Sequence, residues 1–146
     1  MMSTLAKHGY RRLLYICAAG LLLIGLSACS EPPYTNVDNA ELQMMLEKDI
    51  PIYDVRRPEE WRQTGVVEGS KLLTFVEASG HLKPDFIERF TAANSPHDPV
   101  ILICRTGSRT SSLARLLVEK MGYTQVYNVR DGITSWIRED RAVTRL

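Results

Sequence analysis

The stretch at residues 100–112 limits the possible folds of this chain most strongly. Its first four residues, 100–103, are all apolar, as expected of a strand that is buried on both faces of a parallel sheet. Cys104 ends this strand and a short polar loop follows. Leucines and a methionine then recur at helical spacing over residues 111–122. The pattern predicts an α/β protein with a cysteine at the carboxyl end of a buried strand, facing the start of a helix, where open α/β sheets bind ligands.

The predicted surroundings of Cys104 favour a thiolate. The first turn of the following helix offers unpaired N–H groups and a partial positive charge. Gly107 lets the loop bend so that its amides converge on one point, and Arg105 and Arg109 add two positive charges. We therefore expect a nucleophilic sulfur beside a binding place for a small anion. A buried, inert cysteine is the alternative, and the glycine, the arginines and the hydroxyl residues argue against it.

The sequence Cys-Arg-Thr-Gly-Ser-Arg-Thr at residues 104–110 resembles the active-site loop of single-domain rhodaneses, a family of sulfurtransferases. Asp54-Val-Arg56, the Pro-Glu-Glu-Trp sequence at residues 58–61, and residues 122–136 extend the resemblance, which spans residues 34–141. It implies a three-layer α/β sandwich with a central, mainly parallel sheet flanked by helices. Two departures stand out. Val66 replaces a usual histidine, and Asp131-Gly132 replaces a usual Gly-Gly pair.

The resemblance also implies a reaction and the residues that carry it. Cys104 would take a sulfane sulfur from a small anionic donor such as thiosulfate, hold it as a persulfide, and pass it to a thiol or to cyanide. The residues expected to bind the donor are Arg105, Thr106, Gly107, Ser108 and Arg109.

Asp54 and Arg56 are expected in a supporting role, because they end a second predicted strand at residues 51–55. Parallel strands place their carboxyl ends together, so this pair should lie near the Cys104 loop. Arg56 either attracts the anionic donor or pairs with Asp54 to hold the neighbouring loop. We favour the second interpretation.

Other functions remain open. The domain could be a binding module that captures a partner without turnover. A phosphatase or arsenate reductase is a weaker alternative, because related enzymes carry arginine six positions after the cysteine, where this chain has Thr110. His81 and His97 have no second histidine or cysteine at ligand spacing, so we expect neither a metal nor another cofactor.

The first 28 residues have the pattern of a bacterial secretory signal. Three basic residues precede an apolar run of about 14 residues at positions 13–26, shorter than the roughly 20 that span a membrane. The sequence Leu-Ser-Ala-Cys at residues 26–29 resembles a lipobox. We expect cleavage before Cys29, lipid on Cys29, and anchoring at the periplasmic face of the outer membrane, since Ser30 rather than aspartate follows. An inner-membrane location and an uncleaved anchor are the alternatives.

Cleavage would change the charge and the thiol content of the chain. It removes three of 18 basic residues and none of the 17 acidic ones, which leaves a net side-chain charge of −2 and no basic run typical of nucleic-acid binding. Cys104 becomes the single free thiol, which argues against a dithiol oxidoreductase. We expect a monomer with a linker at residues 29–33, a domain at 34–141 and a tail at 142–146.

The remaining elements follow from local patterns. A capping box that begins at Asp38 predicts the start of a helix, and Phe86, Ile87 and Phe90 give the segment 85–93 an apolar helical face. Alternating strands and helices favour an α/β sandwich. The other predicted segments are strands at residues 34–37 and 71–76 and a short helix at 57–62.

Overall fold

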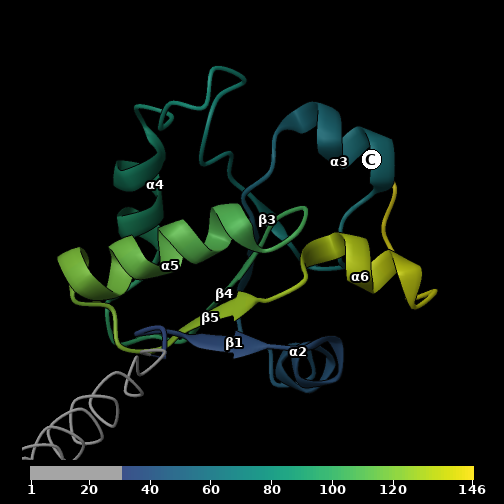
Figure 1. Ribbon diagram of the computed structural model, residues 1–146, viewed down its shortest axis with the longest axis horizontal. Coiled ribbons are helices and arrows are strands. Elements are labelled where there is room, and N and C mark those ends of the chain that lie inside the picture. Colours follow the sequence, from purple (N-terminus) through teal and green to yellow (C-terminus); the bar gives the residue numbers. More distant parts are fainter. Residues whose placement is uncertain (1–30) are drawn as a thin grey trace, which may run out of the picture. The chain divides into compact units, whose positions relative to one another are not determined.

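The computed structural model describes residues 31–146, so the predicted signal segment and Cys29 lie outside the described residues. Residues Pro32–Leu146 form one compact unit. Strands and helices alternate along it, as Figure 1 shows. The strands are β1 (Thr35–Val37), β2 (Ile52–Asp54), β3 (Lys71–Leu72), β4 (Val100–Ile103) and β5 (Val126–Val129). The helices are α2 (Asn39–Leu46), α3 (Pro58–Thr64), α4 (Phe86–Ala93), α5 (Ser108–Met121) and α6 (Gly132–Arg138).

The five strands form one parallel sheet in the order β1-β5-β4-β2-β3. The most apolar strand, β4, is central and pairs with β2 on one side and β5 on the other. In the β2–β4 register, Asp54 lies opposite Ile103. The parallel arrangement therefore places the end of β2 beside Cys104, at the edge of the sheet where ligands bind in open α/β folds.

The side chains of β4 alternate between the two faces of the sheet. Val100, Leu102 and Cys104 belong to the apolar cluster that contains residues of α4 and α5. Ile101 and Ile103 belong to the cluster that contains residues of α2 and α6. All five are at most 1% exposed, and full burial of such an aliphatic side chain contributes about 1.5–3 kcal/mol. The predicted three-layer sandwich around a parallel sheet is confirmed.

Two predicted boundaries need correction. Helix α5 begins at Ser108 instead of Ser111, so Ser108, Arg109 and Thr110 form its first turn and the loop is shorter than predicted. These three residues are polar, and the apolar spacing on which the prediction relied starts only at Leu113. The strand predicted at residues 71–76 is limited to Lys71–Leu72. Beyond it, Leu73 N and Phe75 N still donate to the carbonyls of Asp54 and Val55, but the segment does not continue as a regular strand.

Residues 142–146, the predicted C-terminal tail, contact the domain. Thr144 forms an antiparallel bridge with Val66, with N–H to O distances of 2.8 and 2.9 Å. Arg145 Nη1 donates to the Gln63 carbonyl at 3.2 Å. Val66, at the position where rhodaneses usually have histidine, is therefore a buried residue that binds the C-terminal segment to the domain.

None of the helices in the described part of the chain is both long enough and apolar enough to cross a membrane.

Candidate active site

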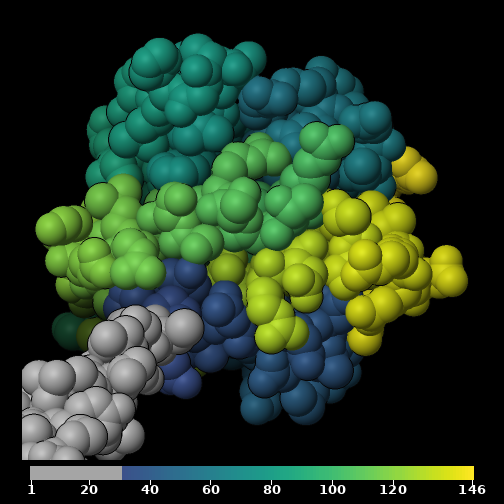
Figure 2. Space-filling model, in the orientation of Figure 1, coloured from purple at the N-terminus to yellow at the C-terminus, as the bar shows by residue number. Residues whose placement is uncertain are grey.

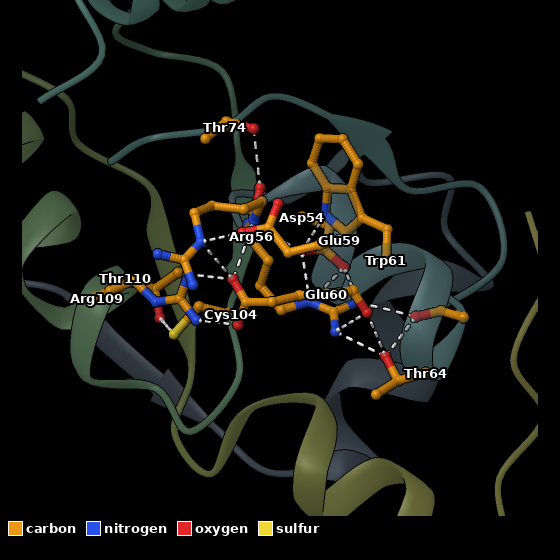
Figure 3. Close-up of polar contacts among 12 residues, drawn as sticks. Asp54, Arg56, Glu59, Glu60, Trp61, Thr64, Thr74, Cys104, Arg109 and Thr110 are labelled. Atoms are coloured by element: carbon orange, nitrogen blue, oxygen red, sulfur yellow. Dashed lines mark hydrogen bonds and ion pairs between the residues drawn. The ribbon is translucent and has the colours of Figure 1, made fainter. Parts of the chain in front are cut away.

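Cys104 follows β4 directly and is buried, with 1% of its surface exposed. Its Sγ lies 3.4 Å from Oγ1 of Thr110, which is itself fully buried in the first turn of α5 (Figure 3). The same hydroxyl group donates to the Gly107 carbonyl at 3.1 Å. The sulfur therefore has apolar neighbours from the core and one hydroxyl partner from the helix that begins next to it.

Two glycines allow the Cys104 loop to pack closely against the turn between β5 and α6. Gly107 has φ +87°, and a Cβ there would lie 1.9 Å from the Arg130 carbonyl oxygen. Gly132 has φ +60°, and a Cβ there would lie 2.6 Å from the Cys104 carbonyl oxygen. Any side chain at either position would displace the backbone of the other segment. A glycine is therefore kept at the second position of the usual Gly-Gly pair, while Asp131 occupies the first.

The start of α6 fixes the direction of the loop carbonyls. Ile133 N donates to the Cys104 carbonyl at 2.9 Å, and Thr134 N donates to the Arg105 carbonyl at 3.1 Å. Unpaired N–H groups at a helix start normally need an acceptor, and here the cysteine loop supplies it. The backbone next to Cys104 is therefore held from outside the loop.

The backbone amides after Cys104 have no acceptor in the part of the chain that the structure describes. Within residues 31–146, the N–H groups of residues 105–110 donate to no backbone or side-chain acceptor. The first bonded amide is that of Ser111, which donates to Gly107 O at 2.9 Å. Consecutive free N–H groups in a turn and at a helix N-terminus attract negative charge. The loop can therefore stabilise an anion formed or bound beside the cysteine.

Arg109 is bound by a carboxylate that the sequence alone did not identify. Its Nη1 and Nη2 donate to Oε2 and Oε1 of Glu60 at 2.7 and 2.6 Å, in a two-pronged pair between α5 and α3. Glu60 also accepts the N–H of Arg57 at the start of α3. The signal in the sequence was the Glu-Glu pair at residues 59–60. Only the structure shows that Glu60 turns inward while Glu59 stays 56% exposed.

Both members of this pair have shifted pKa values. Burial alone would raise the pKa of Glu60, but hydrogen bonds from Arg109 and Arg57, together with their positive charges, lower it to about 2. The hydrogen bond to Glu60 raises the pKa of Arg109 although burial opposes it, and negative charge on Glu60, Cys104 and Asp54 adds to the rise. Arg109 is thus electrostatically coupled to the sulfur, and most of its charge is already balanced.

Arg56 is enclosed in the protein and its N–H donors are used internally. It is 1% exposed, and it binds the Asp54 carboxylate through Nε and Nη2 at 2.7–3.1 Å. The remaining donors reach Thr64 Oγ1 at 2.7 Å and the Gly65 carbonyl at 2.8 Å. Trp61 Nε1 also donates to Asp54, at 3.0 Å. This arrangement (Figure 3) joins β2 to α3 and thereby positions Glu60.

Three of the other four predicted donor-binding residues lie at the surface. Arg105, Thr106 and Ser108 are exposed, whereas Gly107 is buried. In the described part of the chain Arg105 takes part in no salt bridge. His81 and His97 are exposed loop residues, and residues 31–146 contain no cluster of three side chains suited to a metal ion.

These observations define a parallel α/β sandwich whose central strand delivers a cysteine to an amide-rich loop at a helix start. The profile of the rhodanese-like domain family matches residues 38–139. The chain belongs to this family.

The chain is also similar to a named relative and to two solved structures. It is 27% identical over 107 residues to thiosulfate sulfurtransferase 18 of Arabidopsis thaliana, with 70% of this chain and 77% of the relative covered. The structure of a rhodanese-related protein of Thermoplasma volcanium matches with TM-score 0.59 and 25% identity, over 76% of this chain and 98% of the other. The structure of reduced CoADR-RHD of Bacillus anthracis matches with TM-score 0.61 and 25% identity over 77% of this chain. This chain spans only 18% of that longer protein.

Proposed function

We propose that this protein is a sulfurtransferase that carries sulfane sulfur as a persulfide on Cys104. The observation that carries the proposal is the run of amides at residues 105–110, directly after the cysteine, which donate to no acceptor within residues 31–146. Such a run stabilises negative charge on the attacking sulfur and on the persulfide that replaces it. A relative named as a thiosulfate sulfurtransferase supports the same chemistry.

In the first step the Cys104 thiolate attacks the outer sulfur of the donor. With thiosulfate, a new bond forms between Sγ and the outer sulfur while the sulfur–sulfur bond of the donor breaks. The electron pair of that bond leaves with sulfite, and the negative charge of the thiolate passes to the terminal sulfur of the persulfide. No general base is needed once the thiol has lost its proton.

In the second step a thiolate acceptor or cyanide attacks the terminal sulfur. The bond between the two sulfurs of the persulfide breaks, and the Cys104 thiolate is regenerated. Thr110 Oγ1 lies 3.4 Å from Sγ, so its hydroxyl would stabilise that thiolate by turning its single hydrogen from the Gly107 carbonyl to the sulfur. Because Cys104 is 1% exposed, the loop must open locally for the donor to reach it.

Intact mass after incubation with thiosulfate tests the proposal. We expect a gain of one sulfur atom, its loss on addition of cyanide with formation of thiocyanate, and no gain in Cys104→Ser. No mass gain in a folded wild-type chain would refute the transferase and leave a binding module. A gain that persists in Cys104→Ser would place the sulfur on another residue.

Phosphatase and arsenate reductase activities are less well supported by the geometry. Thr110 occupies the position where those enzymes carry arginine, and the guanidinium of Arg109 is already paired with Glu60. A phosphoryl group needs several donors around its equatorial oxygens. We expect no hydrolysis of an aryl phosphate under conditions in which Cys104 accepts sulfur.

We also propose that Cys29 carries a lipid that holds the mature chain at the periplasmic face of the outer membrane, as the lipobox-like sequence at residues 26–29 indicates. Labelling of cells with a fatty-acid analogue should mark the wild-type chain and leave Cys29→Ala unmarked. Membrane fractionation then separates outer-membrane from inner-membrane anchoring. An unlabelled wild-type chain would contradict the lipid proposal.

A further inference from the structure

The sulfur of Cys104 has one hydrogen-bond partner in the described part of the chain. This partner is Thr110 Oγ1, at 3.4 Å from Sγ. Thr110 is 0% exposed, and the space-filling view shows the start of α5, in green, packed between α3, in blue, and α6, in yellow (Figure 2). The hydroxyl group therefore acts on the sulfur out of contact with solvent, where a hydrogen bond to a charged atom is strong.

The hydroxyl hydrogen can turn from one acceptor to another without leaving a buried group unpaired. Thr110 Oγ1 donates to the Gly107 carbonyl at 3.1 Å, and the same carbonyl accepts the N–H of Ser111 at 2.9 Å. When the hydroxyl turns to the sulfur, the carbonyl keeps its bond to Ser111. The hydrogen can therefore face Gly107 while Sγ is neutral and face Sγ while it is negative, at little cost in either state.

The terminal sulfur of a persulfide has to point away from Thr110. A sulfur bonded to Sγ in the direction of Oγ1 would lie less than about 1.5 Å from that oxygen, because the sulfur–sulfur bond takes up about 2 Å of the 3.4 Å between Sγ and Oγ1. The hydroxyl therefore serves Sγ alone. The groups left for the terminal sulfur are the backbone amides of residues 105–110, which donate to no acceptor within residues 31–146.

We propose that the Thr110 hydroxyl assists the discharge of the sulfur and not its capture, and that it thereby sets how fast the persulfide is consumed. The inference rests on the proposed transferase function. In capture, negative charge leaves Sγ as the new sulfur–sulfur bond forms, so a hydrogen bond to the thiolate does not help the attack. In discharge, the acceptor bonds to the terminal sulfur, the sulfur–sulfur bond breaks, and its electron pair goes to Sγ, where the hydroxyl stabilises the charge. A thiolate that is stabilised in this way leaves faster and attacks less readily.

The first test measures the two half-reactions separately, with the full-length chain in alkaline buffer, where a thiol is ionised. Intact mass follows the loading of Cys104 by thiosulfate, and thiocyanate formation follows the discharge of the loaded chain by cyanide. Thr110→Val keeps the shape of the side chain and removes the hydroxyl. We expect discharge to slow about tenfold and loading to change less than about twofold, as expected for the loss of one hydrogen bond to a charged atom.

Two further variants separate the hydroxyl from the shape of the side chain. Thr110→Ser retains a hydroxyl and should keep both rates within about twofold of wild type. Thr91→Val is the matched control, because Thr91 Oγ1 also donates to a carbonyl one turn earlier in its helix, that of Ile87 at 2.9 Å, but lies at the surface of α4. It should change neither rate. Equal slowing of loading and discharge in Thr110→Val, unchanged discharge, or slow discharge in Thr110→Ser would overturn the inference while the transferase stands.

The second test does not depend on sulfur capture. Methyl methanethiosulfonate converts Cys104 to a methyl disulfide and releases methanesulfinate. The thiolate of 2-mercaptoethanol then attacks the methyl-bearing sulfur and expels the Cys104 thiolate, which the mass of the peptide that contains Cys104 follows. Release should be about tenfold slower in Thr110→Val than in wild type and Thr110→Ser. If Cys104 gains no sulfur from thiosulfate, the proposed function fails, and this experiment still decides the role of Thr110. Equal release rates in the three chains would reject the inference.

Discussion

Two arginine–carboxylate pairs lie near the carboxyl ends of the parallel strands. The two pairs have different environments. Asp54 and Arg56 are 0% and 1% exposed, and the guanidinium has further partners in Thr64 and Gly65. The Glu60–Arg109 pair joins two helices, and its side chains are 10% and 24% exposed. One pair is enclosed by its own neighbours, whereas the other lines a surface groove beside the cysteine loop.

The comparison shows how similar charge pairs can have different roles. A fully buried pair must satisfy all its donors internally, because an unpaired buried charge is very costly. Arg56 therefore has no N–H left for a ligand, and its role is to join β2 to α3. The pair at the groove keeps one side accessible, so a ligand can reach it. The Glu60–Arg109 pair (the outer pair) depends on the Asp54–Arg56 pair (the inner pair), because the inner pair holds α3, the helix that carries Glu60.

The largest expected effect comes from breaking the inner pair. Arg56→Met would leave the Asp54 carboxylate buried without its partner, and we expect a loss of about 3–5 kcal/mol in the free energy of unfolding. Arg109→Met, at the more exposed pair, should cost about 1–2 kcal/mol. Urea unfolding followed by circular dichroism measures both. Equal losses for the two variants would show that the pairs do not differ as the burial indicates.

A smaller effect is expected from the acid titration of the outer pair. The pKa of Glu60 is lowered from 4.5 to about 2 in the folded state, so the stabilisation is complete above pH 4.5 and is lost as the pH falls towards 2. Glu60→Gln lacks this dependence. The stability difference between wild type and Glu60→Gln should shrink by about 2 kcal/mol between pH 5 and pH 2.5.

Thermal unfolding over this pH range, with Glu59→Gln as the control, measures the effect. Glu59 is 56% exposed, so its replacement should leave the pH dependence of wild type almost unchanged. A constant difference between wild type and Glu60→Gln across the range would show that Glu60 does not remain ionised through its contact with Arg109.

The sequence was sufficient for the inner parts of the site and insufficient for the outer ones. The apolar run before Cys104 predicted the central strand, because four consecutive apolar residues that end at a polar loop suit a short strand covered on both faces, and all four are buried. The proximity of Asp54 to the cysteine followed from parallel pairing. The first conclusion rests on the run of apolar residues, and the second rests on the parallel pairing of the predicted strands. Both can be inferred from the pattern of residues along the sequence.

The contacts of single side chains were not predictable in the same way. Arg109 seemed free to bind a donor, and its pairing with Glu60 depends on how α3 is oriented against α5. That orientation comes from the hydrogen bonds of Arg56, which link segments by tertiary contact. The start of α5 at Ser108 was also missed, since polar residues at a helix start carry no apolar period.

The smallest expected effect tests the difference between the unpaired and the paired cation. Arg105 is exposed and has no salt bridge in the described residues, so Arg105→Ala should raise the donor KM about fivefold and leave kcat and stability nearly unchanged. This effect should weaken at high salt, because an exposed charge is screened. Arg109→Ala should lower the stability, and it should raise the donor KM less than Arg105→Ala does. If Arg109→Ala gave the larger rise in KM, the donor would displace Glu60 from Arg109, and the outer pair would be a binding element that opens for its ligand.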